Sequence, residues 1–274
     1  MQEIKTRPEY WLISLCVLSC FAGGASGIEL ATEAGGFTID GKPTFLFGIS
    51  YYGALGATRD YILKDLDDMQ RLGFNWIRVW ATWSAFDNDI SAVDADGRIR
   101  QPFFDKLEWL IAECNRRGMI VDVTLSRGEG VITVGRLGTV EAHRRAVNVL
   151  VSELKHLRNW YLDLANENNI PGRGKKPKTL SFDVLASMRR AVRKVDPKRL
   201  ITVSYVGDAA EADLRHCLND VGVDFLSPHR IRRPGCAEKT EEATKQCIDL
   251  IQKIGRVVPV HYQEPFRRDF NPRR

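Results

Sequence analysis

Cysteine and histidine are scarce in this chain of 274 residues, which contains six cysteines and five histidines. None of them lies in a CxxC motif or at a spacing typical of a metal site, so we predict no structural metal and no cofactor. Cys217, Cys236 and Cys247 lie close together in the sequence. Export of the chain would permit one disulfide bond among these three.

The sequence also lacks an apolar run of the roughly 20 residues that a membrane-spanning helix needs. A shorter run over residues 11–21 follows Lys5 and Arg7 and is followed by small residues, a pattern typical of a signal peptide. We therefore predict a signal peptide over residues 1–27 and a secreted or periplasmic mature protein without stable membrane insertion. A lipid-anchored amino terminus at Cys20, which follows Val-Leu-Ser, is the alternative.

Nucleotide-binding motifs are missing as well, because neither GxGxxG nor GxxxxGKS/T follows the first predicted strand. Short apolar strands instead alternate with longer amphipathic segments, which indicates βα units. The predicted strands cover residues 45–50, 75–80, 119–125, 160–165, 200–205, 224–227 and 257–263. This alternation, in a chain of about 250 mature residues, predicts an α/β protein with a (β/α)8 barrel over residues 28–274.

Two local patterns support this architecture. Four amphipathic segments end in a glycine just before a strand, at Gly73, Gly118, Gly222 and Gly255. Glycine suits the left-handed position that ends a helix. Residues 36–43 predict a tight hairpin with an Asp-Gly turn, which we expect to cap the bottom of the barrel.

Two glutamates follow predicted strands at the end where such barrels carry their reactive groups. The fourth strand leads into Asn166 and Glu167, and the seventh ends at Glu264. Cleavage of a glycosidic bond requires one protonated carboxyl group and one ionised carboxylate, and this pair supplies both. Arg78, in the second strand, is expected to keep a nucleophilic carboxylate ionised or to form a structural salt bridge inside the barrel.

Six segments carry a family resemblance: Asp40-Gly41-Lys42-Pro43, Gly48-Ile49-Ser50-Tyr51-Tyr52-Gly53, Asn75-Trp76-Ile77-Arg78, Asn166-Glu167, Ser227-Pro228-His229 and Glu264. In this order they resemble the clan of (β/α)8-barrel retaining glycoside hydrolases that includes the family 5 cellulases and mannanases. The resemblance implies that Glu167 is the general acid/base and Glu264 the nucleophile. It also implies that Arg78 supports the nucleophile, that Asn166 donates to the sugar 2-hydroxyl, and that the anomeric configuration is retained.

Two positions depart from the family pattern. His229 is followed by Arg230 and Ile231, where the family usually has His-x-Tyr. Thr124 or Ser126 stands where the third strand usually ends in histidine. The departures concern the subsite around the nucleophile and leave the carboxylate pair intact.

Only ten residues follow Glu264, too few for a seventh helix, an eighth strand and an eighth helix. We therefore expect a fragment, or a truncated or frameshifted reading frame, whose barrel is incomplete. Its first and seventh strands would have unpaired edges. For the chain as it stands, this predicts poor solubility and weak or absent activity.

Aromatic residues are predicted to gather at the mouth of the barrel, namely Tyr51, Tyr52, Trp80, Trp83, Tyr205 and Tyr262. Flat aromatic faces suit sugar rings, although some of these side chains, Trp80 among them, would fit the core equally well. Our predicted substrate-binding residues are Arg78, Asn166, His229, Tyr52, Trp80, Tyr205 and Tyr262.

Basic residues are predicted on the same side, namely Arg173, Lys175, Lys176, Lys178, Arg230, Arg232, Arg233, Arg267 and Arg268. They indicate either an anionic carbohydrate substrate or a solvated surface in a chain of net charge +5. A nucleic acid partner is not expected, because no groove-reading or base-stacking motif accompanies them.

The sequence thus predicts a retaining glycoside hydrolase that cleaves a poly- or oligosaccharide by double displacement. The alternatives are a non-catalytic carbohydrate-binding barrel or an inactive truncated homologue. Transglycosylation would use the same residues with a sugar as the acceptor.

Overall fold

The computed structural model describes residues 27–85, 88–126, 137–170, 179–207, 210–230 and 235–265. The predicted signal peptide lies outside these residues except for Gly27, so export stays a prediction. Most of the predicted basic residues of the mouth also lie outside them, namely Arg173, Lys175, Lys176, Lys178, Arg232, Arg233, Arg267 and Arg268.

Three antiparallel strands, β1 (Leu30–Glu33), β2 (Gly36–Ile39) and β3 (Lys42–Thr44), close one end of the molecule. The turn residues Asp40 and Gly41 both have positive φ, 51° and 74°, as a tight hairpin turn of this kind requires. Side chains of this sheet pack against residues at the amino ends of the parallel strands, in a cluster of Leu30, Phe37, Leu46, Trp76, Ile120, Tyr161, Leu200 and Phe225. The predicted hairpin that caps the barrel is therefore confirmed.

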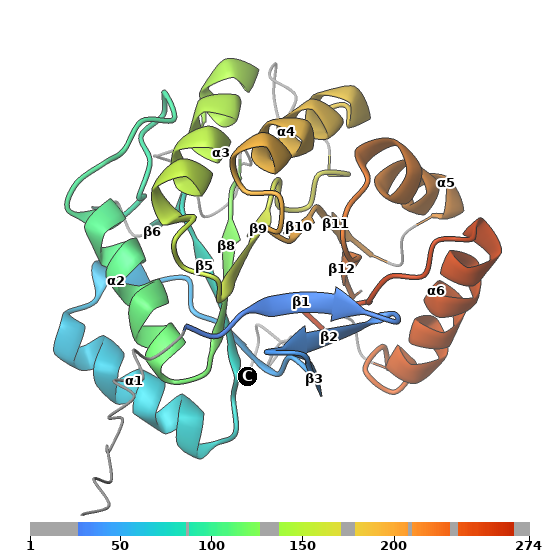
Figure 1. The fold of residues 1–274 in the computed structure, drawn as a ribbon, viewed down its shortest axis with the longest axis horizontal. Helices are drawn as coiled ribbons and strands as arrows, with labels where there is room; N and C mark the ends of the chain where they lie inside the picture. The colour runs from blue at the N-terminus through green and yellow to red at the C-terminus, as the bar shows by residue number, and fades with distance from the viewer. Residues whose placement is uncertain are drawn as a thin grey trace, which may run out of the picture.

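A curved parallel sheet follows, and successive segments of the chain lie side by side in it (Figure 1). Its strands β4 (Gly48–Ser50), β5 (Trp76–Trp80), β8 (Ile120–Thr124), β9 (Trp160–Asp163) and β10 (Ile201–Thr202) are arranged in the order β10-β9-β8-β5-β4. Strands β11 (Ser204–Val206) and β12 (Ser227–His229) form a second parallel pair. Leu226, just before β12, forms a parallel bridge to Val260.

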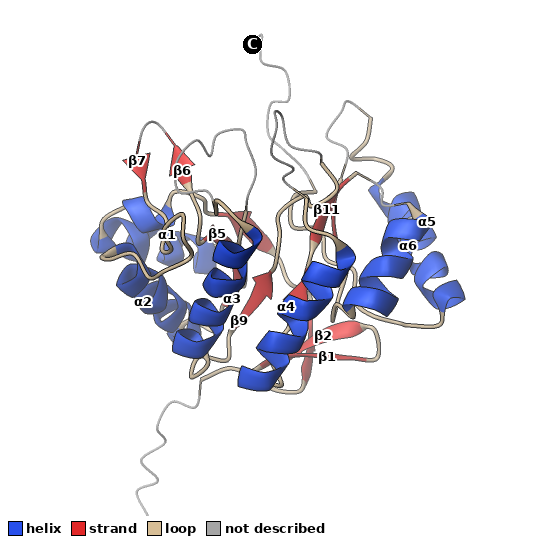
Figure 2. Ribbon diagram, turned by 90° about the horizontal axis from the view of Figure 1, so that it is seen from above, coloured by secondary structure: helices blue, strands red, loops and turns tan. Residues whose placement is uncertain are grey.

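Helices cover the outside of these strands (Figure 2). They are α1 (Arg59–Arg71), α2 (Phe103–Arg116), α3 (Val140–Leu154), α4 (Phe182–Val195), α5 (Glu211–Arg215), which continues into the π-helical turn η2 (His216–Val221), and α6 (Thr240–Ile254). A 3-10 turn, η1 (Ala54–Gly56), and the small hairpin of β6 (Ser84–Ala85) and β7 (Asn88–Asp89) complete the described elements. The hairpin β6–β7 lies at the opposite end of the molecule from β1 and β2.

The helix-ending glycines have the predicted backbone conformation. Gly73, Gly118, Gly222 and Gly255 have φ values of 80°, 71°, 79° and 85°. The apolar face of each helix packs on the strands, as Ile62 and Leu66 of α1 do, and forms the main hydrophobic core. The α/β architecture with a parallel sheet inside a layer of helices is therefore as predicted.

Two predicted strands differ in extent from the structure. The strand predicted over residues 200–205 divides at Val203, because β10 pairs with β9 whereas β11 pairs with β12. The strand predicted over residues 257–263 is reduced to a single bridge with one hydrogen bond on either side of it. Pro259 and Pro228 have no amide hydrogen for a longer ladder, which explains the short pairing.

The structure contains no disulfide bond between Cys217, Cys236 and Cys247, all of which it describes. Cys217 is buried in the core, and burial raises the pKa of its thiol to about 12. The expectation of a bridge among these three is therefore not met. No helix within the described parts of the chain has the length and apolar character needed to cross a membrane.

His261 gives a testable link between burial and stability. Its ring lies among aromatic rings, 4.8 Å from Trp76 and 5.9 Å from Phe37 between centroids. Burial, with the charges of Arg78 and His229, lowers its pKa to about 3. An unfolded chain protonates histidine near pH 6.5, so the folded state loses stability as the pH falls from about 6.5 toward 3.

The wild type should have a lower free energy of unfolding at pH 5 than at pH 7.5, and His261 should account for about 2 kcal/mol of this difference. We expect His261→Phe to remove that part. Urea unfolding at the two pH values measures this, with His156→Phe at an exposed histidine as the matched control. The same pH dependence in His261→Phe and in the wild type would show that His261 titrates normally in the folded protein.

Candidate active site

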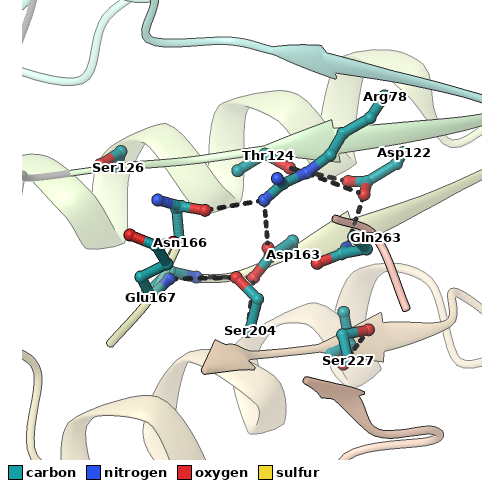
Figure 3. A network of polar contacts seen from close by, with 12 residues as sticks. Arg78, Asp122, Thr124, Ser126, Asp163, Asn166, Glu167, Ser204, Ser227 and Gln263 are labelled. Carbon is teal, nitrogen blue, oxygen red and sulfur yellow. Dashed lines mark hydrogen bonds and ion pairs between the residues drawn. The ribbon is translucent and has the colours of Figure 1, made fainter. Parts of the chain in front are cut away.

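Polar side chains from neighbouring strands meet inside the parallel sheet. Arg78 on β5 has Asp122 on β8 as its cross-strand partner, and Thr124 on β8 is paired with Asp163 on β9. Alternate residues of a strand face the same side, so these four side chains all lie in the barrel interior. Figure 3 shows them converging on the guanidinium group.

The fully buried Arg78 side chain is the centre of this network. Its contacts are Nη1 to Glu264 Oε1 (2.6 Å), Nη2 to Asp163 Oδ2 (3.1 Å) and Asn166 Oδ1 (2.8 Å), and Nε to Thr124 Oγ1 (3.0 Å) and Asp122 Oδ2 (3.3 Å). Burial alone would lower the pKa of Arg78, but the three carboxylates outweigh burial and raise it above its ordinary value. The guanidinium therefore stays charged and fixes the Glu264 carboxylate in place.

Glu167 lies just beyond the carboxyl end of β9 in an unusual backbone conformation. Its φ is 46°, in the left-handed region that side chains other than glycine rarely adopt. The Ser204 hydroxyl accepts a hydrogen bond from the Glu167 backbone N–H at 3.1 Å. The carboxylate oxygen Oε1 lies 3.1 Å from Nδ1 of the buried His229. Such local strain, maintained by its surroundings, is characteristic of functional positions.

Glu264 has a different environment, although it lies close to Glu167. Its Oε1 accepts hydrogen bonds from Arg78 and from the Tyr52 hydroxyl, the latter at 2.7 Å. Burial and the nearby Glu264 charge raise the pKa of Tyr52 to about 12, so its hydroxyl stays protonated and able to donate. Two hydrogen bonds to its charged form favour an ionised Glu264.

Glu167, His229 and Glu264 offer ligand atoms that all lie within 4.8 Å of one another. Three such groups are able to hold a metal ion in principle. However, the Arg78 guanidinium bonds to the Glu264 oxygen at 2.6 Å, and its positive charge opposes a second cation there. The arrangement fits a pair of carboxylates held by hydrogen bonds better than it fits a cation site.

The aromatic side chains predicted at the mouth take different positions. Tyr52, Trp80 and Trp83 form one cluster, with Tyr52 stacked on Trp83 at 4.8 Å and edge-on to Trp80 at 5.6 Å. Trp80 is only 7% exposed and lies 5.4 Å from the Arg78 guanidinium, so it supports the site from within. Tyr51 lies aside, where its hydroxyl bonds to Asp65.

Tyr205 is not at the predicted position, whereas Tyr262 lies beside Glu264 in the lining of one cavity. Tyr205 is 4% exposed and belongs to the core between strands and helices. The Tyr262 hydroxyl accepts a hydrogen bond from Thr244 on α6 at 3.1 Å. Tyr205 directly follows Ser204, which faces the interior, and the alternation along the strand turns the tyrosine to the other side. The predicted position of Tyr205 at the mouth was wrong for this reason.

Arg230, the one predicted basic residue among those the structure describes, is buried. Its guanidinium donates to the Cys236 carbonyl oxygen at 3.2 Å and lies 6.0 Å from the Tyr262 ring. It thus serves the local structure after β12.

Four polar residues of the site were not predicted from the sequence: Asp122, Asp163, Ser204 and Gln263. Each is buried, and each lies within or beside an apolar strand. Their spacing provided a signal, because Asp122 and Thr124 lie two residues apart in an otherwise apolar segment. A polar residue at every second position of a buried strand indicates a filled, hydrogen-bonded interior.

A cavity of about 680 Å³ adjoins the site along β4. Glu264, Gln263 and Tyr52 line it, together with Gly48 and Ser50 of β4. Among the described strands, β4 pairs only with β5. The cavity therefore reaches Glu264 from the side of β4, whereas Glu167 is not part of its lining.

No protein-family model and no curated protein sequence matches the chain. Solved structures do share its fold. A glycoside hydrolase family 5 mannosidase from Rhizomucor miehei is similar with a TM-score of 0.68 and 15% identity, over 90% of this chain and 75% of that one. An endo-1,4-beta-mannanase from the same organism has a TM-score of 0.64 and 14% identity, over 85% and 80%.

A beta-mannanase from the blue mussel Mytilus edulis has a TM-score of 0.52 and 15% identity, over 86% of this chain and 92% of that one. At these identities the similarity establishes the fold alone. The chain has the α/β-barrel fold of glycoside hydrolase family 5 structures, as the sequence motifs predicted.

Proposed function

We propose that this protein is a retaining glycoside hydrolase that cleaves carbohydrate by double displacement. The observation that carries the proposal is the carboxylate pair of Glu167 and Glu264, whose nearest oxygens lie within 4.8 Å of each other. Retaining glycosidases separate their carboxyl groups by about 5 to 5.5 Å, whereas inverting enzymes need about 6.5 to 9.5 Å to accommodate a water molecule. The short separation favours retention.

The different environments of the two carboxyl groups indicate which is the nucleophile and which is the proton donor. Glu264 accepts hydrogen bonds from Arg78 and Tyr52 and is therefore the ionised nucleophile. The carboxyl oxygen of Glu167 lies 3.1 Å from the His229 imidazole, and we assign Glu167 as the proton donor. Different surroundings of two carboxylates set the acid and the nucleophile apart in such sites.

In the first step, a Glu264 oxygen forms a bond to the anomeric carbon while the bond to the leaving oxygen breaks. The Glu167 proton passes to that oxygen. In the second step, a water oxygen forms a bond to the anomeric carbon, the bond from that carbon to Glu264 breaks and releases the carboxylate, and Glu167 takes the proton of the water. Asn166 accepts from Arg78 through Oδ1, which directs its amide nitrogen to serve as a donor to a sugar hydroxyl.

Hydrolysis of a substrate panel tests the proposal. The panel contains nitrophenyl β-glycosides of neutral sugars and of a uronic acid, together with β-mannan and β-glucan. The proposal predicts that the wild type hydrolyses at least one of them, contrary to the weak or absent activity expected from the sequence, and that Glu264→Ala, purified in parallel, loses this activity. Binding of a glycan without hydrolysis of any member would contradict the proposal and favour a carbohydrate-binding barrel.

Tyr52→Phe is expected to lower kcat/KM by about 10- to 100-fold, because a hydrogen bond to a charged group contributes about 1.5 to 3 kcal/mol. Steady-state kinetics on the best substrate of the panel measures this. Tyr51→Phe is the matched control, since the Tyr51 hydroxyl bonds to Asp65 outside the site. Equal effects of the two substitutions would mean that the bond to Glu264 has no role in catalysis.

A further inference from the structure

A chain of hydrogen bonds runs from the buried Asp122 to the carboxyl group of Glu167. Gln263 Nε2 lies 2.5 Å from Asp122 Oδ2, and Gln263 Oε1 lies 3.2 Å from His229 Nε2. His229 Nδ1 in turn lies 3.1 Å from Glu167 Oε1. Gln263 and His229 are both buried, so these hydrogen bonds are shielded from solvent. They connect Glu167 to Asp122 Oδ2, the oxygen that lies 3.3 Å from Arg78 Nε.

The direction of each hydrogen bond follows from groups that are only able to donate. The Trp76 indole N–H donates to the Tyr161 hydroxyl at 3.0 Å, so the Tyr161 hydrogen points to Asp122, 3.1 Å away. Arg78 Nε donates to the Thr124 hydroxyl, whose own hydrogen therefore goes to the other oxygen of Asp122 at 2.8 Å. Both oxygens of Asp122 act as acceptors.

An accepting carboxylate sets the orientation of the Gln263 amide. Its Nε2 group must face Asp122 above the pKa of about 7 to which burial raises this carboxyl, because the reversed amide would then place two oxygens 2.5 Å apart with no hydrogen between them. Gln263 Oε1 then faces His229 Nε2, and since a carbonyl oxygen only accepts, that ring nitrogen must carry a hydrogen. In the neutral imidazole, Nδ1 is consequently the unprotonated nitrogen.

An unprotonated Nδ1 facing Glu167 Oε1 at 3.1 Å is satisfied when the hydrogen belongs to the Glu167 carboxyl group. The opposite tautomer would donate from Nδ1 and stabilise the carboxylate instead. Other charged or titratable groups near the ring are Glu264, 4.0 Å from Nδ1, the adjacent Arg230 and the buried His261. None of these contacts Nε2, the atom that Gln263 controls, in the bonds described.

We infer that Gln263 is a positioning residue that fixes the Nε2–H tautomer of His229 and thereby keeps the proton on Glu167. The inference rests on the proposed function for its catalytic meaning, since the proton it retains is the one given to the leaving group. The tautomer itself is a property of the folded protein and is measurable without any substrate.

Nitrogen-15 NMR of protein labelled at histidine provides the first test, because ring shifts distinguish protonated from unprotonated nitrogens. His229→Gln identifies the His229 signals. The wild type is expected to show a protonated Nε2, and Gln263→Met is expected to show the Nδ1–H tautomer. Gln252→Met, at an exposed glutamine of α6, is the control and should leave the His229 signals unchanged. An unchanged Nε2–H tautomer in Gln263→Met would overturn the inference.

Leaving-group dependence provides the second test. A dinitrophenyl leaving group needs no proton, whereas a sugar or phenol leaving group does. We expect Gln263→Met to lower kcat/KM at least about 10-fold for the substrate with a sugar or phenol leaving group, the scale typical of groups that orient a catalytic residue. For the dinitrophenyl substrate, we expect kcat/KM to fall by less than about 3-fold. An equal loss on both substrates would show that Gln263 acts on the fold alone and would overturn the inference.

Gln263→Asn keeps the amide but shortens its reach, and is used for both tests if Gln263→Met does not fold. If no substrate is hydrolysed by the wild type, the proposed function fails, while the NMR result still decides whether Gln263 sets the tautomer.

Discussion

Replacing Glu264 with alanine is expected to reduce hydrolysis by roughly 10⁵-fold, the scale associated with the loss of a catalytic nucleophile. The substitution removes the oxygen that would attack the anomeric carbon and leaves Arg78 with Asp122 and Asp163 as its remaining carboxylate partners. The fold should therefore persist, and carbohydrate binding with it. Steady-state kinetics with a dinitrophenyl glycoside and equilibrium binding of a matching oligosaccharide measure the two effects.

Added azide provides a control for the identity of the reaction. A small anion fits the space that the Glu264 carboxylate occupied next to the cavity, and it should restore turnover and yield a glycosyl azide of inverted configuration. Glu167→Ala should instead give an azide product of retained configuration, because azide then replaces the water of the second step. A Glu264→Ala protein that retains more than about one hundredth of the wild-type activity would exclude Glu264 as the nucleophile.

Arg78→Met is expected to lower the free energy of unfolding by about 3 to 5 kcal/mol, because removal of one partner leaves buried charges uncompensated. Three carboxylates, of Asp122, Asp163 and Glu264, would then share an interior without a cation. Burial already raises the pKa of Asp122 to about 7 while Arg78 opposes that shift, so loss of the guanidinium should favour protonation. Urea unfolding near neutral pH measures the loss.

The control for this substitution is Arg71→Met, which breaks an exposed ion pair with Asp68 and should cost less than about 1 kcal/mol. Adding Asp163→Asn to Arg78→Met should recover part of the lost stability, since one of the repelling charges is removed. A loss for Arg78→Met no larger than that of Arg71→Met would mean that the buried carboxylates do not depend on Arg78.

Local sequence patterns predicted those parts of the fold that depend on the backbone near one position. The Asp40-Gly41 turn and the glycines that end helices require positive φ, which few other residues adopt, and the structure has them as expected. Asn166 and Glu167 follow the end of β9 after two further residues, and Glu264 follows a segment bridged to Leu226. Their convergence was predictable because the carboxyl ends of parallel strands share one face.

The errors arose where tertiary pairing decides which way a side chain points. Tyr205 lies one position away from Ser204, which faces the interior, and the sequence does not specify the register of a strand as short as β11. Cys217 became a core residue because η2 packs against α4 and places it inward. Proximity along the chain did not provide the geometry of a disulfide bond.

The interior network was difficult to predict for a different reason. Asp122 and Asp163 contact Arg78, which lies 44 and 85 residues away from them in sequence, and only the packed barrel brings the three together. Gln263 adjoins the predicted nucleophile but has its partners on β8 and β12. A polar residue in an apolar strand predicts a hydrogen-bond partner for its side chain, but the sequence does not identify which residue that partner is.

Covalent trapping tests the central claim, that Glu264 is the nucleophile of a retaining glycosidase, most directly. The wild type is incubated with the 2-deoxy-2-fluoro glycosyl fluoride of the sugar that the panel identifies, and the labelled peptide is located by mass spectrometry. We predict one added sugar on Glu264, with Glu167 unmodified. A label on Glu167 or another residue, or continued hydrolysis of the substrate without any labelled enzyme, would contradict the proposed mechanism.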